Sequence, residues 1–549
     1  MSASDTIPRG SFENPSSDLP SDADAVVEAL LQTVTDAKQR FGEPGASDHD
    51  MAAWDLSTTQ HRLSLGELTL VDLVEARIRL TVSASLSTHC LTAFPWSRAL
   101  RHASQLDNRI SSENASASAS ASASASASGF AAALKELPLL GLVFSVKDCI
   151  HVSGLPTTLG CSSRASNPAK QSAWIVTHLE QLGAIMIAKT AAPQLMMSNT
   201  TESPLWGRVR SPLCTSGEEF QVGGSSGGEA ALVALGGSQL GLGTDMGGSV
   251  RQPAALNTLV GLKLVSQPNN LKWQCAEEGD YMTGLPDTNV PATALGFLAK
   301  HLDTINHVYR VLLARADRDD EPVAPLSSIS NEREASLSLP AASIKFTTQA
   351  ASSQLTQLIS SVAAALGIGA EQQLGPIDAK FWGSAWTAFA KQHAFEHARK
   401  MLGSDALIHR TLFDEHAEPA SDPGYDLGVI RQRFVRLLSK TPAEAEGEGE
   451  GGGNNTPEQV PVLLITPTHK LGPCSRSDFD AADKEGDAEL WCQVFNLMDW
   501  PAINVPLARP ASSSGDGENT HALGVQLATT PGNELLLLEY ARKIRTLSL

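Results

Sequence analysis

The sequence has no stretch of about 18 uninterrupted apolar residues, which is the length that a membrane-spanning helix needs. Its N-terminal segment also lacks the basic region followed by an apolar region that marks a secretory signal peptide. Residues 1–20 are instead polar and rich in proline and serine, and we expect them to form a disordered tail. These absences predict a soluble protein of the cytoplasm without a transmembrane segment.

Basic residues are scarce relative to acidic ones. The chain has 41 lysines and arginines against 60 aspartates and glutamates, which gives a formal net charge of −19. Such a surface repels nucleic-acid phosphates, and the sequence contains no local basic patch that would offset the repulsion. Nucleic-acid binding is therefore disfavoured as the main activity, and a small neutral or amphiphilic substrate fits better.

Paired cysteines are absent as well. The seven cysteines are scattered along the chain without any CxxC pair. This usage predicts a reducing compartment and buried free thiols. The cysteines are Cys90, Cys149, Cys161, Cys214, Cys275, Cys474 and Cys492.

What the sequence does contain is enough apolar material for a large core. Hydrophobic residues make up 42% of the chain and charged residues 18%. Strand-like and helix-like segments alternate at 139–147, 173–183 and 184–188, and this alternation predicts an α/β fold with a largely buried sheet. Further expected elements are strands at 460–466, 502–506 and 523–528 and a closing helix at 532–545.

Several helix starts can be identified from capping residues. An amphipathic helix is expected to begin near Asp22 because apolar residues follow it at helical spacing. A second helix is predicted over Leu70–Leu80, opened by Thr69 with Asp72 three residues on. Ser172 is the expected cap of the helix at 173–183.

Domain boundaries follow from composition. We expect a helical extension at 21–62 and a single domain at 63–549. Three stretches within that domain are low in apolar residues and are predicted to be flexible insertions. They lie near 112–128, 444–458 and 510–519.

Glycine is dense at 223–264, where it surrounds three serines: GGSSGGEAALVALGGSQLGLGTDMGGSVRQPAALNTLVGLKL. Glycine permits close approach of the backbone to a ligand, and a Gly-rich turn before a helix exposes N–H groups to anions. The same density is also typical of tight turns. A phosphate-binding P-loop would need a GxxxxGK[ST] pattern, which is missing. The pattern GGSSG at 223–227 matches the GxSxG nucleophile elbow, but no downstream histidine stands out as its partner.

The whole block resembles the amidase signature family, with GGSSGG, GLGTD, GGSVR, PA and GLK in register. Upstream, GLVFSVKD, TTLGCSS and LEQLGAIMIAKT resemble its lysine strand, the following loop and a helix–strand unit. Downstream, FNLMDWPAINVP and GVQLATTPGNELLLLEYA resemble its closing elements. The resemblance extends from about residue 63 to 545, apart from the insertions. It implies an α/β fold in which helices flank both faces of a large twisted mixed β-sheet, and an enzyme that hydrolyses carbon–nitrogen amide bonds.

Position by position, the resemblance places the family's catalytic Lys–Ser–Ser arrangement on Lys147, Ser225 and Ser249. It implies that Ser249 is the nucleophile, that Ser225 passes the proton to Lys147, and that the Gly224–Ser225 peptide bond is cis. The implied oxyanion hole consists of the backbone N–H groups of Met246, Gly247, Gly248 and Ser249. The implied supporting residues, which hold the loop by hydrogen bonds, are Ser226, Thr244, Asp245 and Arg251.

The chemistry of Lys147 is consistent with this role on physical grounds. A serine hydroxyl is a weak nucleophile and needs an adjacent base. Lys147 ends an apolar run, so burial could leave it partly neutral and able to accept a proton through Ser225. The alternative is a solvated lysine at a strand end, which is the common situation for lysine. We interpret the neighbouring Asp148 as structural.

The sequence departs from the family in ways that concern loop geometry and substrate class. GLVFSVKD lacks the usual proline at its third position, and Leu264 follows GLK where proline is usual. Asn257 and Thr258 replace a pair of small residues, and Ala191 stands where asparagine often follows Lys-Thr. None of these departures removes a catalytic group.

A second motif points to a different chemistry. His393, Glu396 and His397 match HxxEH, and on a helix the two histidines would share a face, as zinc ligands must. No third ligand can be identified, so we expect no metal, and no other cofactor is indicated. A nearby aromatic set is interpreted as helix core, with the wall of a hydrophobic acyl pocket as the alternative. Its members are Phe381, Trp382, Trp386, Phe389 and Phe395.

Three functions remain open at this point. The first is a free-standing amidase that acts on a small-molecule amide through an acyl-enzyme on Ser249. The second is a glutaminase similar to the A subunit of tRNA-dependent amidotransferases, which would need partner chains. The third is a non-catalytic protein that retains the fold, against which the intact Lys147, Ser225 and Ser249 argue. Assembly as a homodimer also stays open.

Overall fold

The computed structural model describes residues 20–117, 125–266, 294–316, 339, 343–390, 427–439, 462–508 and 521–547. Apart from Pro20, the predicted tail lies outside these ranges, and so do the predicted insertions near 444–458 and 510–519. The insertion predicted at 112–128 is partly helical, because α5 (Trp96–Ala117) continues into it and α6 (Ala125–Glu136) begins within it. The alternating Ser/Ala repeat is thus compatible with helix at both of its ends.

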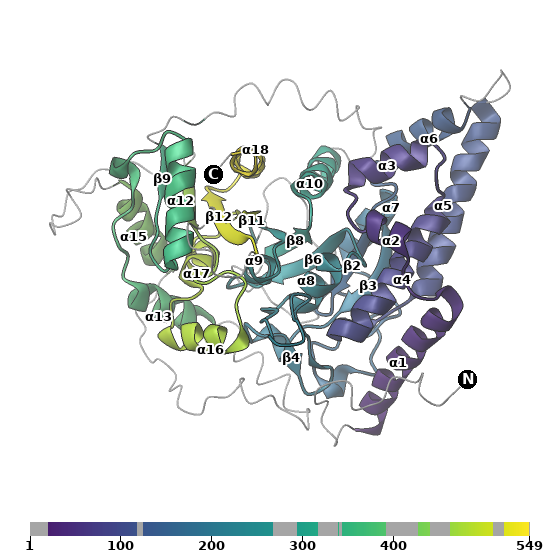
Figure 1. Ribbon diagram of the computed structural model, residues 1–549, viewed down its shortest axis with the longest axis horizontal. Coiled ribbons are helices and arrows are strands. Elements are labelled where there is room, and N and C mark those ends of the chain that lie inside the picture. The colour runs from purple at the N-terminus through teal and green to yellow at the C-terminus, as the bar shows by residue number, and fades with distance from the viewer. Residues whose placement is uncertain are drawn as a thin grey trace.

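A ten-stranded mixed sheet organises the described residues (Figure 1). β2 is parallel to β3 and β6, and β10 is parallel to β9, whereas the other pairs are antiparallel. In spatial order the strands are β1 (Leu91–Ala93), β3 (Ile185–Thr190), β2 (Val143–Lys147), β6 (Leu240–Asp245), β8 (Ala294–Ala299), β7 (Val260–Lys263), β11 (Ala502–Leu507), β12 (Leu523–Thr529), β10 (Leu463–Pro467) and β9 (Ile344–Phe346). A separate pair is formed by β4 (Glu202–Ser203) and β5 (Gly207–Arg208).

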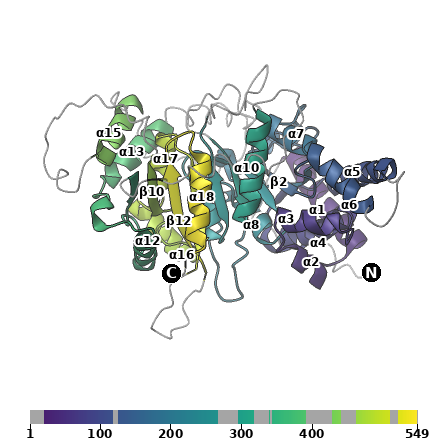
Figure 2. The same ribbon diagram turned by 90° about the horizontal axis from the view of Figure 1, so that it is seen from above.

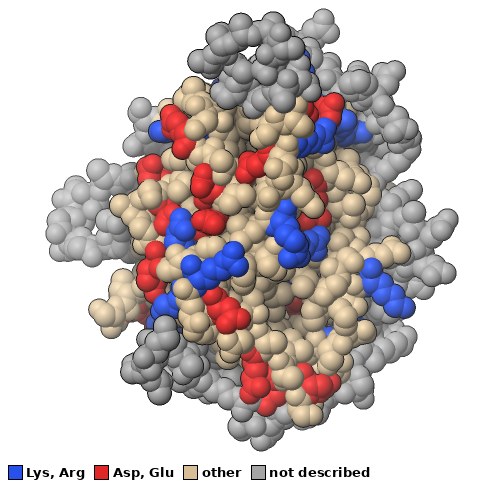
Figure 3. Space-filling model, turned by 90° about the vertical axis from the view of Figure 1, so that its right-hand side faces the viewer, with Lys and Arg blue, Asp and Glu red and all other residues tan. Residues whose placement is uncertain are grey.

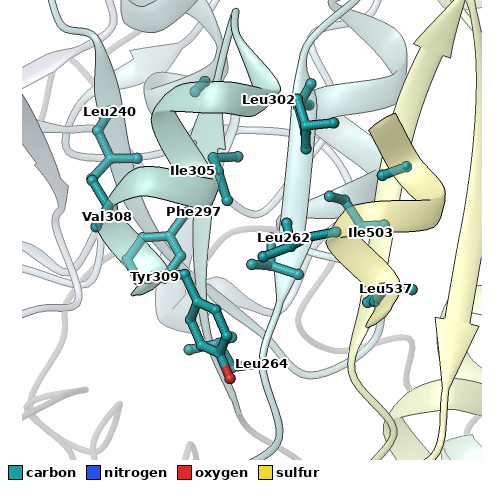
Figure 4. Packing of buried hydrophobic residues seen from close by; sticks show 14 of the residues in the cluster. Leu240, Leu262, Leu264, Phe297, Leu302, Ile305, Val308, Tyr309, Ile503 and Leu537 are labelled. Carbon is teal, nitrogen blue, oxygen red and sulfur yellow. The ribbon is translucent and has the colours of Figure 1, made fainter. Parts of the chain in front are cut away.

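Both faces of the sheet are covered, as the alternation along β8 illustrates. Phe297 points into the largest hydrophobic cluster, whereas its neighbour Leu298 belongs to a cluster on the opposite face. Figure 4 shows Phe297 packing with Ile305, Val308 and Tyr309 of the helix above it. On that face lie α7 (Trp174–Gln181), α10 (Leu302–Ala316), α12 (Ser353–Ala365) and α18 (Glu534–Arg545), and α10 and α18 run side by side (Figure 2).

The opposite face carries the helices that frame the candidate site. α8 (Gly227–Ala234) packs on β6, and α9 (Arg251–Leu256) packs on β7 and β11. Beside them, α17 (Leu490–Leu497) contacts α13 (Ala379–Ala390) and α15 (Leu427–Ser439). α16 (Arg476–Glu485) lies beside α13 and α17 in Figure 1. The expected α/β fold, a large mixed sheet flanked by helices on both faces, is confirmed.

The N-terminal helices gather on the side of the molecule where β2 and β3 lie (Figure 1), and α5 packs on β3. α1 (Ser21–Phe41), α2 (Ala46–Met51) and α5 pack around α4 (Leu70–Thr88), and α3 (Leu56–Ser64) contacts α6. α4 begins as predicted, with a capping box between Thr69 and Asp72. It runs past the expected end at Leu80 and ends at Thr88, and the next residue, His89, has a left-handed conformation. The segment predicted as an extension thus shares a hydrophobic cluster with the rest of the domain.

The surface charges, the cysteines and the helices of the described residues bear on expectations drawn from the composition. On the face formed by the N-terminal helices, acidic and basic side chains are interspersed (Figure 3). Arg62 of α3 pairs with Glu67, which follows that helix. Five of the six described cysteines are buried, and all six are free thiols. None of the helices in the described ranges combines the length and the apolarity that crossing a bilayer requires.

Candidate active site

The candidate catalytic residues lie where two neighbouring parallel strands end. Lys147 is the last residue of β2, which pairs with β6. The loop 246–250 follows β6 and carries Ser249, and α9 begins directly after it. Ser225 stands two residues before α8, which packs on the same strands. The fold therefore brings three separate segments of the chain together at the C-terminal ends of β2 and β6.

The amine of Lys147 is completely buried and surrounded by neutral oxygen atoms. Its Nζ donates to Ser225 Oγ at 2.7 Å, to Thr244 Oγ1 at 3.2 Å and to the Thr244 carbonyl at 3.3 Å. Burial lowers the pKa of Lys147, although nearby groups including Cys149 and Asp245 oppose the shift. The lysine is thus placed to exchange a proton with Ser225.

Two other buried lysines show that burial alone does not distinguish Lys147. Lys189 Nζ lies 3.6 Å from Asp148 Oδ1, and Lys263 Nζ lies 3.9 Å from a carboxylate oxygen of Asp499. In the described parts of the chain, Lys147 has no carboxylate within 4 Å. An opposite charge stabilises the protonated form of an amine, so Lys147 lacks a contact that the other two possess. Asp148 is also hydrogen-bonded by Thr92 and Thr158, in line with the structural role expected for it.

The segment around Ser225 is fixed mainly by its backbone. The Gly224–Ser225 peptide bond is cis, as the family resemblance implied. The Gly224 N–H donates to Gln252 Oε1 at 2.8 Å, and the Ser226 N–H donates to the Ser249 carbonyl at 3.1 Å. Ser226 therefore supports the loop through its main chain, whereas its buried hydroxyl has no hydrogen-bond partner among the described residues. The supporting hydrogen bond of Ser226 is thus made by its backbone N–H.

Asp245 and Arg251 form a buried ion pair beneath the loop that carries Ser249. Arg251 Nη2 and Nε lie 2.8 and 3.0 Å from the two carboxylate oxygens. Burial favours the neutral acid, but the Arg251 guanidinium holds the pKa of Asp245 well below its usual range. The carboxylate also accepts the N–H groups of Gly248 at 2.9 Å and Val250 at 3.1 Å. The expected supporting role of this pair thus corresponds to a dense set of hydrogen bonds.

These contacts narrow the set of backbone donors that could hold an oxyanion. The resemblance implied four N–H donors, but the Gly248 N–H already donates a hydrogen bond to the Asp245 carboxylate. Within the described residues, the N–H groups of Met246, Gly247 and Ser249 have no protein acceptor. Ser249 and Met246 are also partly exposed, in contrast to the buried Ser225. The loop therefore presents three free N–H groups beside a partly exposed hydroxyl, an arrangement suited to acyl transfer.

Comparison with known proteins establishes the family of the chain. Residues 74–391, more than half of the 549-residue chain, match the protein-family model described as Amidase. The chain belongs to the amidase family. Lys147, Ser225 and the loop with Ser249 all lie inside the matched range of this family model.

Relatives of the amidase family match parts of the chain. Amidase 1 of Gibberella moniliformis is 38% identical over 224 residues, which are 41% of this chain and 39% of that protein. Fatty acid amide hydrolase 1 of Caenorhabditis elegans is 30% identical over 271 residues, 48% of this chain and 42% of that protein. The matched segments thus span about two fifths of these relatives. A solved fatty acid amide hydrolase has a TM-score of 0.65 at 17% identity and covers 99% of this chain and 93% of its own, which establishes the fold.

Several polar residues of this amidase-family site were not identified from the sequence. Asn496 of α17 donates to the Asp245 carbonyl at 3.0 Å and accepts from Arg251 at 2.6 Å. Gln526 of β12 accepts from Arg251 Nη1 at 2.7 Å. Both lie in the downstream segments that resemble the family's closing elements. Each is a polar residue inside an apolar segment of the sequence. That pattern could have indicated a buried hydrogen bond, because a buried polar side chain needs a partner.

Glu229 is a second buried ionisable group close to Lys147. Its carboxyl group accepts hydrogen bonds from Thr190 Oγ1 at 2.6 Å and from Ser145 Oγ. Burial raises the pKa of Glu229 to about 8, against the effect of these hydrogen bonds and of Lys147. A carboxyl group that stays protonated at neutral pH adds no negative charge near Lys147 and so favours the neutral amine, whereas the ionised Asp245 acts in the opposite direction.

Two departures from the family pattern are accommodated by specific contacts. Asn257 is buried, and its Nδ2 donates to the Val222 carbonyl at 2.7 Å just before the GGSSGG segment. The Ala191 carbonyl accepts the N–H of Gly228 at 3.3 Å. Both residues therefore help to place the start of α8 beside β3.

The aromatic set is divided between the core and the site. Trp382 is buried in a hydrophobic cluster with Phe434, as the core interpretation predicted. Trp386 has a different environment, because its indole N–H donates to the Met246 carbonyl at 3.1 Å. The side chain of Phe389 and all of Phe395 lie outside the described residues, as do His393 and His397 of the HxxEH motif. In the described part of the chain, no three His, Cys, Asp or Glu side chains are placed to hold a metal ion.

Proposed function

We propose that this chain is an amide hydrolase that forms an acyl-enzyme on Ser249, with Lys147 as the base acting through Ser225. The observation that carries this proposal is the 2.7 Å contact between Lys147 Nζ and Ser225 Oγ, made by a lysine that is fully buried. Membership of the amidase family and the relatives named as amidases support the reaction type.

In the proposed reaction, Ser249 Oγ attacks the amide carbon and gives its proton to Ser225, whose own proton moves to the neutral Lys147. The N–H groups of Met246, Gly247 and Ser249 stabilise the negative charge on the amide oxygen. The carbon–nitrogen bond then breaks, and the proton returns through Ser225 to the leaving nitrogen. Water hydrolyses the acyl-enzyme by the same proton path. Ser249 Oγ makes no hydrogen bond to a described residue, and catalytic hydrogen bonds are often long until substrate is bound.

A small neutral or amphiphilic amide is the proposed substrate. The acidic chain and the relatives named fatty acid amide hydrolase support this choice. A glutaminase remains the second candidate, because the A subunit of a glutamyl-tRNA(Gln) amidotransferase from Salinibacter ruber is 44% identical over 126 residues. Release of ammonia from glutamine in the presence of partner chains would favour that candidate. A homodimer and a cytoplasmic location stay predictions.

A fluorophosphonate probe tests the proposed nucleophile. Wild-type protein should be labelled, and Ser249→Ala should abolish the label. The neighbouring serines provide a matched comparison: Ser225→Ala should lose most of the labelling rate, whereas Ser226→Ala should stay detectably labelled because the Ser226 hydroxyl has no partner. Peptide mapping that places the adduct on Ser225 would contradict the proposal and favour the GxSxG interpretation. An unlabelled wild-type protein would favour the non-catalytic alternative.

A further inference from the structure

Three carbonyl groups in the segment 245–249, which joins the end of β6 to the loop that carries Ser249, accept hydrogen bonds. In a trans peptide unit the C=O and the N–H point in opposite directions, so a donor that holds the carbonyl also orients the N–H. The Asp245 carbonyl accepts from Asn496 Nδ2 at 3.0 Å, and the Met246 carbonyl accepts from Trp386 Nε1 at 3.1 Å. The Gly248 carbonyl accepts from the Gln252 N–H at 2.8 Å.

The three held carbonyls correspond to the three free N–H groups. The N–H groups on the same peptide units belong to Met246, Gly247 and Ser249. The remaining peptide unit is held from its other side, because the Gly248 N–H donates to Asp245 Oδ1. Every peptide unit of the loop is therefore fixed, and the units with a free N–H are those with a restrained carbonyl.

Trp386 reaches this loop from a distant helix, α13. Besides its hydrogen bond to Met246, the indole ring packs against Gly247, where an added Cβ would lie 2.6 Å from Trp386 Cζ2. The ring thus covers the Met246–Gly247 peptide while the indole N–H holds its carbonyl. Two contacts from one side chain restrain the orientation of a single peptide unit.

The orientation of the Asn496 amide is set by its partners. Arg251 can only donate, so the Asn496 oxygen must face Arg251 Nη2 and the nitrogen must face the Asp245 carbonyl. Asn496 is completely buried, which leaves it without competing water. The Asp245–Arg251 ion pair therefore also fixes the donor that restrains the Asp245–Met246 peptide.

From these contacts we infer that Trp386 and Asn496 are positioning residues that aim and strengthen the N–H groups of Gly247 and Met246 toward the oxyanion. The inference rests on the proposed function, in which these N–H groups stabilise the transition state. A donor at the carbonyl polarises the peptide and makes its N–H a better donor. Preorganised N–H groups also need no reorientation as charge develops. Both residues act through the backbone and do not touch the reacting atoms.

The substitution Trp386→Phe tests this role, because phenylalanine retains an aromatic ring and removes only the indole donor and part of the ring. We expect kcat to fall about 10-fold with KM unchanged, a smaller loss than the 100- to 1,000-fold expected when an oxyanion donor itself is removed. Affinity for an acyl trifluoromethyl ketone, which becomes tetrahedral on a serine, should weaken by the same factor as kcat/KM. Asn496→Asp, which retains the acceptor for Arg251 and removes the amide donor, should also lower kcat.

The matched control is Trp382→Phe, on the same helix but in the hydrophobic core. It should lower Tm without changing kcat or ketone affinity, as expected for a structural residue. Equal effects of the two tryptophan substitutions on kcat, or an unchanged kcat in Trp386→Phe, would overturn the positioning role. A wild-type protein without labelled Ser249 would instead overturn the proposed function and this inference with it.

Discussion

Replacing Lys147 with arginine separates the charge of this side chain from its ability to accept a proton. Arginine keeps the positive charge but cannot give up its proton at any accessible pH, whereas methionine has a similar length and no charge. The proposed mechanism needs a neutral amine 2.7 Å from Ser225 Oγ. We therefore expect Lys147→Arg and Lys147→Met to be nearly equally damaged.

The structure sets the size of this effect. Loss of a positioned general base costs on the order of 100- to 10,000-fold in rate. Lys147 has no exposed surface, and three oxygen atoms lie within 3.3 Å of its Nζ, so a water molecule has little room to take its place. We expect kcat/KM to fall toward the larger end of that range. A purely electrostatic role would instead leave Lys147→Arg much more active than Lys147→Met.

The pH dependence gives an independent readout. Burial lowers the pKa of Lys147 below 10.5, and the protonated amine below that pKa cannot act as a base. The kcat/KM of the wild type should therefore rise with pH as Lys147 loses its proton, and then level off. The residual activity of both variants should lack this rise. Stopped assays on folded protein across about pH 6 to 10 would measure it.

Lys189→Arg is the control, because Lys189 is equally buried but paired with Asp148. The pH midpoint of kcat/KM of the Lys189→Arg variant should match that of the wild type, whatever the change in the stability of the variant. Retention of most activity in Lys147→Arg, together with an unchanged pH profile, would refute the neutral-lysine mechanism even if Ser249 is labelled.

Two further predictions concern the groups around the site. Asp245→Asn should lower the free energy of unfolding in urea by about 3 to 5 kcal/mol, because Arg251 would remain buried without its carboxylate, and a loss below about 1 kcal/mol would contradict this. Glu229 has a folded-state pKa of about 8 against an ordinary value of 4.5, so the folded protein keeps a proton that the unfolded chain has released, and stability falls as pH rises across that window. Glu229→Gln removes this dependence, and its Tm relative to the wild type should be higher at pH 8 than at pH 5. An equal difference at both pH values would show that Glu229 is ionised in the folded state.

The sequence predicted which segments are buried better than it predicted their conformation. The segment 139–147 was expected to be one strand, but β2 begins only at Val143. Leu139 and Leu140 are buried within a turn that contains Gly141 at φ 87°. Apolar residues specify burial, and a short apolar run does not by itself distinguish a strand from a buried turn.

Helix caps show a similar limit. Thr69 caps α4 as predicted, because its partner Asp72 lies within the same helix turn. The prediction for Ser172 was wrong, since α7 begins after Ala173 and the Ser172 hydroxyl accepts the Ser153 N–H at 2.9 Å. A local partner makes a cap predictable, whereas a partner from a distant loop can recruit the same hydroxyl for another purpose.

The site was predictable only as far as its residues act locally. The resemblance implied a pairing of Lys147 with Ser225 and a cis bond before Ser225, and the structure contains both this contact and this bond. The resemblance also counted the Gly248 N–H among the oxyanion donors. The Gly248 N–H is unavailable because the Asp245 carboxylate is turned toward it by Arg251. The side chain beneath a glycine loop determines which N–H groups of the loop stay free. The glycine pattern contains no information about that side chain.

The orientation of Arg251 depends in turn on residues far along the chain. Its guanidinium donates to Asn496 Oδ1, to the Cys492 carbonyl and to Gln526 Oε1, all from downstream elements. A lone glutamine within the buried strand β12 indicates that a polar partner must exist, because an unpaired amide there would be costly. The sequence does not identify that partner, since it becomes a neighbour only when β12 and α17 pack against α9. The segments that close the fold therefore also determine which N–H groups the loop before α9 leaves free.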